Sequence, residues 1–162
     1  MTQRSVIHDT FSIARTYPAN LSRVFGAFAS QEAKNVWCDT GDLESHDADG
    51  AHAEFDFRIG GRERFGFKYQ DTTYRYDALY YDIVPGDRII YSYEMYADGT
   101  RISVSVATIE FAETSDGAAL TWTEQGSYLD GFDGPGAPQL RSEGTAEMLD
   151  GLEKYLASQP VS

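Results

Sequence analysis

Apolar and polar residues alternate with a period of two along most of the chain, which is typical of strands with one buried face. Seven segments have this pattern: residues 8–16, 51–59, 62–69, 73–84, 89–96, 102–112 and 118–128. Short links with turn residues, such as Gly60-Gly61 and Asp98-Gly99, join the last six of them. Successive strands with links this short pair antiparallel, so the pattern predicts one meandering sheet.

Three segments have helical spacing instead. Asn20 is a suitable cap for a first helix, and Ser30 is a suitable cap for a second, short one. Residues 138–157 predict a long helix. Its apolar stripe is Thr145, Met148, Leu149, Leu152, Tyr155 and Leu156. The order β-α-α-β6-α therefore predicts an α+β fold, with a seven-stranded antiparallel sheet and its helices on one face.

Composition describes one acidic domain over residues 1–162. Acidic side chains number 26 against 13 basic ones, which leaves a net charge of −13. This charge repels phosphate backbones and anionic lipids, so we expect neither nucleic acid nor a membrane as a partner. The single cysteine, Cys38, excludes an internal disulfide and fits a reducing compartment. The chain shows no signal peptide and no apolar run of about 20 residues, so we expect a cytoplasmic protein.

Several local motifs resemble the START-like or helix-grip superfamily. They are Arg-Thr-Tyr-Pro-Ala at 15–19, Phe-Asp-Phe-Arg-Ile-Gly-Gly at 55–61, and the segments 81–90 and 120–126. Within the superfamily, the chain is similar to bacterial proteins that resemble the C-terminal domain of the Hsp90 ATPase activator. The resemblance implies a curved sheet that grips the C-terminal helix around an apolar cavity, used for binding lipids, hormones or polyketides and occasionally for catalysis. Family members often carry an aromatic residue where this chain has Thr145.

Strand alternation predicts which side chains face the last helix. The predicted inward set is Phe55, Phe57, Phe65, Phe67, Tyr91, Tyr93, Met95, Val104, Val106, Leu120 and Trp122. The residues predicted to line the cavity are Arg15, Phe55, Phe57, Phe67, Tyr91, Tyr93, Trp122, Glu124, Met148 and Leu152. Segment 73–84 has tyrosines in both phases, so its orientation stays open. Gly144 and Gly151 indicate either close packing of the last helix or an open pocket.

Glu124 is the best candidate for acid or base chemistry. It shares the phase of Leu120 and Trp122, so we expect it to face inward. A carboxylate in apolar surroundings either finds a partner or has its pKa raised. Arg15 is the predicted partner, because the first and last strands are neighbours in the helix-grip order. The pair is either a structural ion pair or a polar anchor at the cavity.

Five basic residues gather in the hairpin region around the third strand: Arg58, Arg62, Arg64, Lys68 and Arg75. Arg62 and Arg64 share a strand face opposite Phe65 and Phe67, so we expect these two on the solvated face, beside Glu54, Asp56 and Glu63. The alternative is a basic lobe that meets an acidic partner, including the acidic half of a second copy in a homodimer.

Metal and nucleophile signals are weak. His46, Asp47, Asp49 and His52 are the nearest approach to a metal site, and the calcium-loop pattern that starts at Asp47 lacks its final glutamate. Cys38 has no local signature of a thiol nucleophile. We therefore expect no metal and no cofactor.

The sequence thus predicts a protein that binds a small apolar, aromatic or lipid-like ligand in an internal cavity. No sequence motif assigns a reaction, and we expect a binding protein rather than an enzyme. One alternative is an enzyme of the polyketide-cyclase or hydrolase type that uses cavity tyrosines and Glu124. The other is a protein-interaction module similar to the Hsp90 activator's domain.

Overall fold

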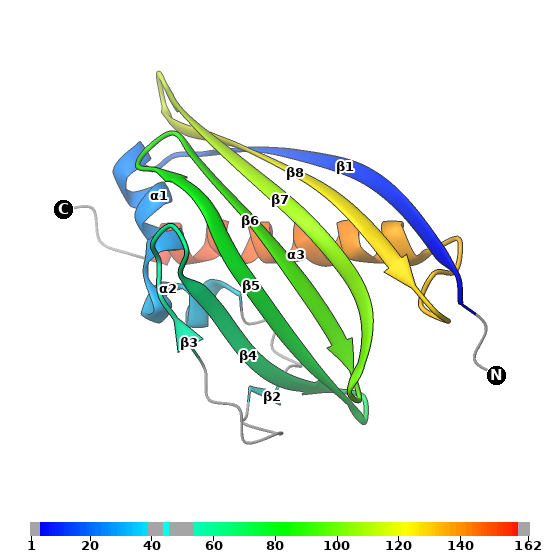
Figure 1. Ribbon diagram of the computed structural model, residues 1–162. Helices are drawn as coiled ribbons and strands as arrows, with labels where there is room; N and C mark the ends of the chain where they lie inside the picture. Colours follow the sequence, from blue (N-terminus) through cyan, green and yellow to red (C-terminus); the bar gives the residue numbers. More distant parts are fainter. Residues whose placement is uncertain (1–3, 39–43, 46–53, 159–162) are drawn as a thin grey trace.

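The computed structural model describes residues 4–38, 44–45 and 54–158 (Figure 1). The chain begins with strand β1 (Val6–Tyr17) and helices α1 (Leu21–Ala29) and α2 (Gln31–Trp37). Both predicted caps are confirmed. Asn20 accepts a hydrogen bond from the backbone N–H of Arg23, and Ser30 accepts one from the backbone N–H of Ala33. These bonds satisfy backbone donors that would otherwise lack a partner at the start of each helix.

One antiparallel sheet follows. Its long strands are β1, β4 (Arg62–Tyr69), β5 (Thr72–Val84), β6 (Arg88–Ala97), β7 (Thr100–Thr114) and β8 (Gly117–Leu129). Two strands of two residues, β2 (Glu44–Ser45) and β3 (Glu54–Phe55), pair with β4. The strand order is β1-β8-β7-β6-β5-β4-β2, so the first and last long strands are neighbours.

The predicted α+β helix-grip fold is confirmed, and two details differ. Of the strand expected at 51–59, the structure describes Glu54–Phe55, while residues 51–53 lie outside the described part. Glu44–Ser45 pairs with β4 although the segment 38–50 was expected to be a loop. Pairing along an exposed sheet edge needs backbone groups only, so an acidic segment can join it without an apolar pattern.

Helix α3 (Ala137–Ser158) crosses the concave face of the sheet, and α1 and α2 cover one end of that face (Figure 1). The Tyr17 hydroxyl donates to the Leu149 carbonyl oxygen at 3.1 Å, which ties the middle of α3 to β1. A Cβ atom at Gly151 would lie 2.5 Å from the Trp37 carbonyl oxygen. Gly151 therefore serves close packing between α2 and α3, whereas a Cβ atom at Gly144 would meet nothing within 4 Å.

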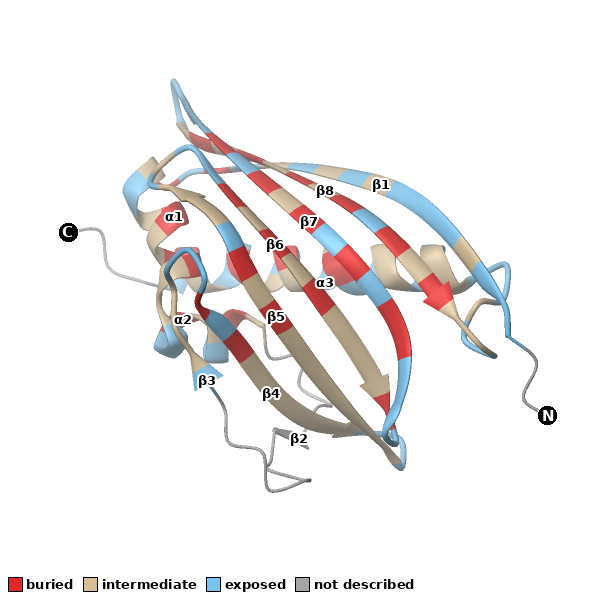
Figure 2. Ribbon diagram, in the orientation of Figure 1, coloured by how far each residue is buried: buried red, intermediate tan, exposed pale blue. Residues whose placement is uncertain are grey.

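Burial alternates along the long strands, as Figure 2 shows most clearly on β7 and β8. This alternation settles the phase of β5. Tyr74, Tyr76 and Tyr80 share the concave face with the inward residues of β4 and β6, and Tyr81 is 58% exposed. A β-bulge follows Tyr80 and shifts the register.

The prediction of which β7 side chains face the last helix was wrong by one position. Val104 and Val106 are 37% and 40% exposed, while Ser103 and Ser105 are buried on the concave side. Ile109 and Phe111, farther along the same strand, share the phase of the two serines and are buried in the core. The strand is continuous, so these apolar residues determine its phase and carry the serines inward.

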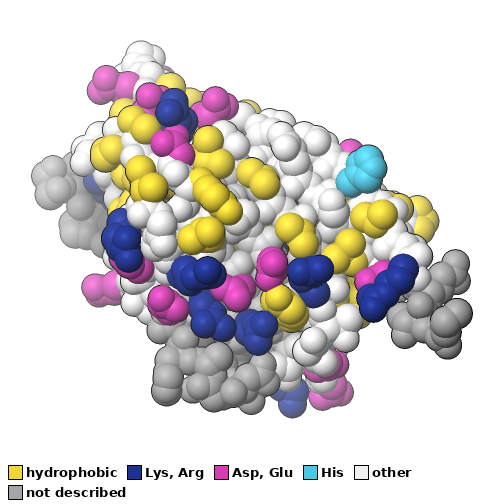
Figure 3. All heavy atoms as spheres, viewed as in Figure 1, with side chains coloured by type: hydrophobic (Ala, Val, Ile, Leu, Met, Phe, Trp, Pro, Cys, Tyr) yellow, Lys and Arg dark blue, Asp and Glu magenta, His cyan; other side chains and the backbone are white. Residues whose placement is uncertain are grey.

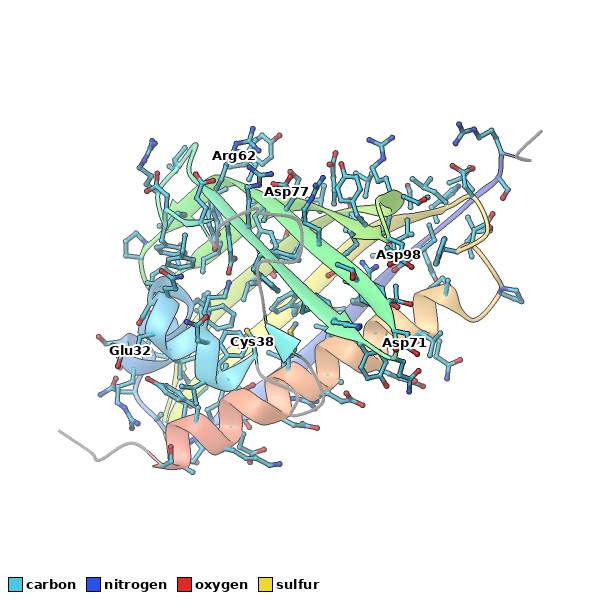
Figure 4. The ribbon with its side chains drawn as sticks, turned by 90° about the horizontal axis from the view of Figure 1, so that it is seen from below. Glu32, Cys38, Arg62, Asp71, Asp77 and Asp98 are labelled. Atoms are coloured by element: carbon cyan, nitrogen blue, oxygen red, sulfur yellow. The ribbon has the colours of Figure 1, made fainter. Side chains whose placement is uncertain are left out.

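Basic and acidic side chains lie side by side on the convex face (Figure 3). Arg62 and Arg64 approach Asp77 at 3.9 and 3.5 Å, and the Arg75 guanidinium lies over the Tyr96 ring. In Figure 4, Arg62 and Asp77 lie on the outer side of the sheet, opposite Cys38 at the end of α2. The solvated position expected for Arg62 and Arg64 is thereby confirmed.

Candidate functional site

Glu124 lies on β8, on the concave face, and is 2% exposed. The Tyr93 hydroxyl donates to one carboxylate oxygen at 2.6 Å, and the Trp122 indole N–H donates to the other at 3.2 Å. Strands β6 and β8 supply these side chains, with β7 between them. The inward position predicted for Glu124 from its phase with Leu120 and Trp122 is confirmed.

Arg141, in the first turns of α3, is the cation of this group. Its Nη1 atom lies 3.8 Å from Glu124 Oε2 and donates to the Tyr93 hydroxyl at 2.9 Å. Its Nη2 atom donates to Ser103 Oγ at 2.9 Å. The guanidinium also lies 5.5 Å from the Tyr93 ring and 5.4 Å from the Tyr128 ring, within cation–π range. We call Glu124, Tyr93, Arg141, Ser103 and Trp122 the Glu124 cluster.

Burial has changed the proton affinities in this cluster. Desolvation raises the pKa of Glu124, although the Tyr93 hydrogen bond and the Arg141 charge act in the opposite direction. Desolvation also raises the pKa of the Tyr93 hydroxyl far above its ordinary value. Glu124 therefore keeps its proton to a higher pH than a glutamate in water, and Tyr93 stays a neutral hydrogen-bonding group.

The Ser105 hydroxyl is a further buried polar group beside Glu124, and its hydrogen bonding is incomplete. Its hydroxyl is close enough to Glu124 to help lower that pKa, yet it makes no hydrogen bond of good geometry with any residue that the structure describes. Gly126 faces it from β8, and a Cβ atom there would lie 3.0 Å from Ser105 Oγ. A glycine at 126 therefore leaves room for the serine. A buried hydroxyl whose hydrogen bond is poorly aligned is less favourable than one with a well-formed bond.

A second ion pair lies at the α2 end of the same face. Lys34 Nζ donates to Glu63 Oε2 at 2.7 Å, and the Tyr80 hydroxyl donates to the same oxygen at 3.0 Å. We call these three residues the Lys34 cluster. Glu63 was expected on the solvated face, and that prediction was wrong. It shares the phase of Phe65, so the alternation that places the phenylalanine inward also buries the glutamate.

Protonation is also fixed in this second cluster. Burial alone would lower the pKa of Lys34, but the Glu63 carboxylate outweighs it and keeps the ammonium charged well above neutral pH. Burial raises the pKa of the neighbouring Cys38 thiol to about 12. A thiol with that pKa is protonated at neutral pH, so Cys38 is not an activated nucleophile.

Aromatic rings connect the two clusters. Tyr91 lies between them, with its ring 5.7 Å from Tyr80, 5.9 Å from Tyr93 and 6.3 Å from Trp122. Half-buried rings continue this surface toward β4, where Phe65 stacks on Tyr76 at 4.8 Å. The concave face therefore presents an aromatic surface with a buried ion pair at each end.

The residues predicted to line a cavity fall into separate groups. Tyr93, Trp122 and Glu124 belong to the Glu124 cluster, with Tyr91 beside it. Phe57 packs against Tyr80 at 5.1 Å. Each of the others has a partner elsewhere on the concave side: Phe55 lies under Lys34, Phe67 stacks on Tyr74, and Met148 and Leu152 pack into the core from α3.

Arg15 is not the partner of Glu124, so that prediction was wrong. Phe11 is the residue opposite Glu124 in the β1–β8 register, and Arg15 is opposite Leu120. Four residues along a strand correspond to ~13 Å, which is too far for an ion pair. Arg15 instead donates to Asp150 at 3.2 Å on α3.

Sequence reasoning missed Arg141, Ser105, Lys34 and Glu63. A signal existed for Arg141, which lies four residues before Thr145 and eight before Leu149, both buried, and so shares their face of α3. Glu63 could have been found from its phase with Phe65. Two open hollows among the described residues lie around Asn20 at the α1 end, away from the Glu124 cluster. The internal cavity therefore stays a prediction.

Two further observations concern metals and membranes. Among the described residues, no three His, Cys, Asp or Glu side chains are grouped as a metal site requires. The candidates His46, Asp47, Asp49 and His52 lie outside these residues. Within the described helices, none combines the length and the apolar character needed to span a bilayer.

Comparison with known proteins identifies relatives of the whole domain. No curated protein is significantly similar to the chain. An uncharacterised protein from Rhizobium leguminosarum is 40% identical, with a TM-score of 0.85, over 98% of this chain and 100% of that one. Mll3558 from Rhizobium loti is 42% identical, with a TM-score of 0.81, over 93% of this chain and 99% of that one.

A more distant structure shares the fold alone. DynU16, a protein of the dynemicin biosynthetic locus, is 17% identical with a TM-score of 0.62, over 93% of this chain and 48% of that one.

The family model described as "Activator of Hsp90 ATPase homolog 1-like protein" matches residues 18–157 of this chain. The chain therefore belongs to the Activator of Hsp90 ATPase homolog 1-like family.

Proposed function

We propose that this protein binds a small, largely aromatic or apolar molecule on the concave face, over the rings of β4–β6 and against the Glu124 cluster. The observation that carries the proposal is a buried, charged and incompletely satisfied polar group at the edge of half-buried aromatic rings. Ligand sites commonly combine apolar walls with a few convergent polar groups.

A purely structural role explains the Glu124 cluster less well. Apolar side chains of similar volume often stabilise a core as much as a buried ion pair does, or more. Here, Glu124 and Arg141 lie beside a serine hydroxyl without a well-formed hydrogen bond. Arg141 is 18% exposed, so the cluster reaches the surface through its guanidinium. A ligand that bonds to Ser105 and Arg141 would supply the missing partner.

A saturable titration with an uncharged aromatic dye tests this function. N-phenyl-1-naphthylamine becomes fluorescent in apolar surroundings, and we expect it to bind wild-type protein with a stoichiometry near one. The Tyr76→Ala variant removes a half-buried ring and should bind more weakly. Val106→Thr changes the convex face and serves as the matched control. Linear, non-saturable fluorescence, together with a native mass spectrum that contains no co-purified molecule, would refute the proposal.

A second candidate is catalysis at the same place. Glu124 has a raised pKa and shares a short hydrogen bond with Tyr93, an arrangement that general acid–base chemistry uses. The fold of DynU16, from a biosynthetic locus, is compatible with this candidate. If Glu124 is a general acid, Glu124→Gln abolishes turnover of a bound substrate and leaves its Kd nearly unchanged. A parallel loss of binding would favour an anchoring role instead.

A further inference from the structure

Strand β1 forms a long edge of the sheet that no other described strand pairs with. It is the terminal strand in the order β1-β8-β7-β6-β5-β4-β2, so β8 occupies only one of its two sides (Figure 1). The opposite edge differs, because the short strands β2 and β3 pair with β4 there. A free strand edge presents a row of backbone N–H and C=O groups that can pair with another chain.

Two hydrogen bonds show which backbone groups of β1 point outward. The Asp130 N–H donates to the Ser5 carbonyl oxygen at 3.1 Å, in the position that continues the β1–β8 register. Hydrogen-bonded and non-hydrogen-bonded pairs alternate along antiparallel strands, so the odd-numbered residues of β1 bond to β8 and the even-numbered ones point away. The Thr10 N–H agrees with this phase, since it donates to the Asp9 side chain at 2.8 Å.

Strand β1 lacks the usual features that protect an edge. Natural sheets protect edge strands with proline, lysine, bulges or short length. β1 runs for 12 residues without proline or lysine, and its register with β8 is continuous. Its even-numbered side chains are exposed, while Phe11 and Ile13 are half-buried. The strand is therefore suited to pairing along its free side.

The side chains of β1 are self-complementary about Ser12. In an isologous contact, residue i of one copy meets residue j of the other, and j meets i. Two antiparallel β1 strands centred on Ser12 would place Asp9 opposite Arg15 twice. They would also place Phe11 opposite Ile13 twice. These odd-numbered residues would form the non-hydrogen-bonded pairs, in which side chains lie closest and opposite charges or apolar groups stabilise a sheet.

The charges favour this register over its neighbours. The outward backbone groups can bond only when even-numbered residues meet even-numbered ones, so the register can slip only in steps of two residues. A slip of two residues would place Asp9 opposite Ile13 or Tyr17, and both ion pairs would be lost. The register centred on Ser12 keeps the backbone bonds and both ion pairs together.

Arg15 has hydrogen-bonding capacity for a second carboxylate. Its Nη2 atom donates to Asp150 at 3.2 Å and to the Ala146 carbonyl oxygen at 3.4 Å. Its Nε atom is buried and has no hydrogen-bond partner among the residues that the structure describes. A guanidinium has five N–H donors, so the Asp9 carboxylate of a second copy can bond to Arg15 without displacing Asp150.

We infer that β1 is the interface for a second copy of this chain, paired antiparallel about Ser12, so that the two sheets join into one continuous sheet. The inference is independent of the proposed function, because neither the Glu124 cluster nor the rings of β4–β6 belong to β1.

Sedimentation equilibrium of the full chain, from micromolar to hundreds of micromolar, measures this association. The wild-type protein should approach twice the mass of one chain as its concentration rises. Asp9→Arg and Arg15→Glu each replace both opposite-charge pairs with like-charge pairs, so each should raise the dimer Kd by about tenfold or more. An equimolar mixture of these two variants should recover the dimer, because each chain then supplies the charge that the other lacks.

Two further variants test the backbone pairing and the specificity of the charge effect. Ser12→Pro removes an outward N–H and should abolish the dimer while the chain still folds, since proline is tolerated on edge strands. Glu110→Arg makes the same charge change at an exposed position of β7 and should keep the wild-type association. Thermal unfolding of each variant checks that it folds.

Three results would overturn the inference. The first is a wild-type protein that stays monomeric at hundreds of micromolar. The second is a dimer that Ser12→Pro or Asp9→Arg leaves unchanged, because its contact would then lie elsewhere on the molecule. The third is a mixture of Asp9→Arg and Arg15→Glu that associates no more than either variant alone.

Discussion

Arg141→Met removes the cation of the Glu124 cluster and keeps much of the apolar stem. It leaves Glu124 without the charge 3.8 Å away and removes the donor to Tyr93. Removing one partner of a buried pair destabilises a protein by about 3–5 kcal/mol. Because Arg141 is 18% exposed, we expect the lower end, about 3 kcal/mol. For a chain of 162 residues this corresponds to a Tm lower by about 6–12 °C.

This loss of stability should depend on pH. Desolvation raises the pKa of Glu124 and Arg141 opposes that rise, so the pKa is higher still in the variant. A carboxyl group whose pKa is raised by folding stabilises the fold below its unfolded pKa, and this stabilisation is lost as the pH rises through the folded pKa. The variant should therefore be closest to wild type in acid and fall behind it as the pH rises.

Urea unfolding, followed by tryptophan fluorescence at several pH values, measures both effects. Arg62→Met is the matched control, because Arg62 is exposed and 3.9 Å from Asp77, and its loss should change stability by less than about 1 kcal/mol. Adding Glu124→Gln to Arg141→Met should recover part of the stability at neutral pH, since no unpaired charge remains. A deficit no larger than that of the control, or one independent of pH, would refute the reasoning.

Three further predictions concern packing and reactivity. Gly151→Ala should destabilise the protein by more than about 1 kcal/mol, because its Cβ atom would lie 2.5 Å from the Trp37 carbonyl oxygen. Gly144→Ala should stabilise α3 by about 0.5–1 kcal/mol, because its Cβ atom would meet nothing within 4 Å. Thermal unfolding compares the two variants. Cys38 is half-buried with its pKa near 12, so it should react with iodoacetamide at pH 8 much more slowly in native protein than in urea, and equal rates would contradict the raised pKa. Tyr17→Phe should lose about 0.5–1.5 kcal/mol with its hydrogen bond to α3, and an unchanged urea midpoint would show that this bond contributes nothing.

Local pattern was enough to predict the elements and much of the concave face. Period-two alternation places Phe65, Tyr93 and Trp122 inward, and the structure agrees. The same rule predicted that Glu124 is buried, because side chains two apart on a strand share a face whatever their chemistry. It failed on β7, where an apolar residue was assumed to mark the buried side and the serines occupy that side instead.

The sequence by itself thus determined the order of strands and helices, the helix caps and the burial of a carboxylate in an aromatic surface. These properties depend on residues a few positions apart, so they can be read along the chain. Only the tertiary structure decided the partners of the buried charges. Glu124 meets Arg141 rather than Arg15, and Glu63 meets Lys34, because strand register and the position of each helix along the sheet determine which side chains meet. Those quantities come from the packing of the whole core, where each buried charge must find its counterion.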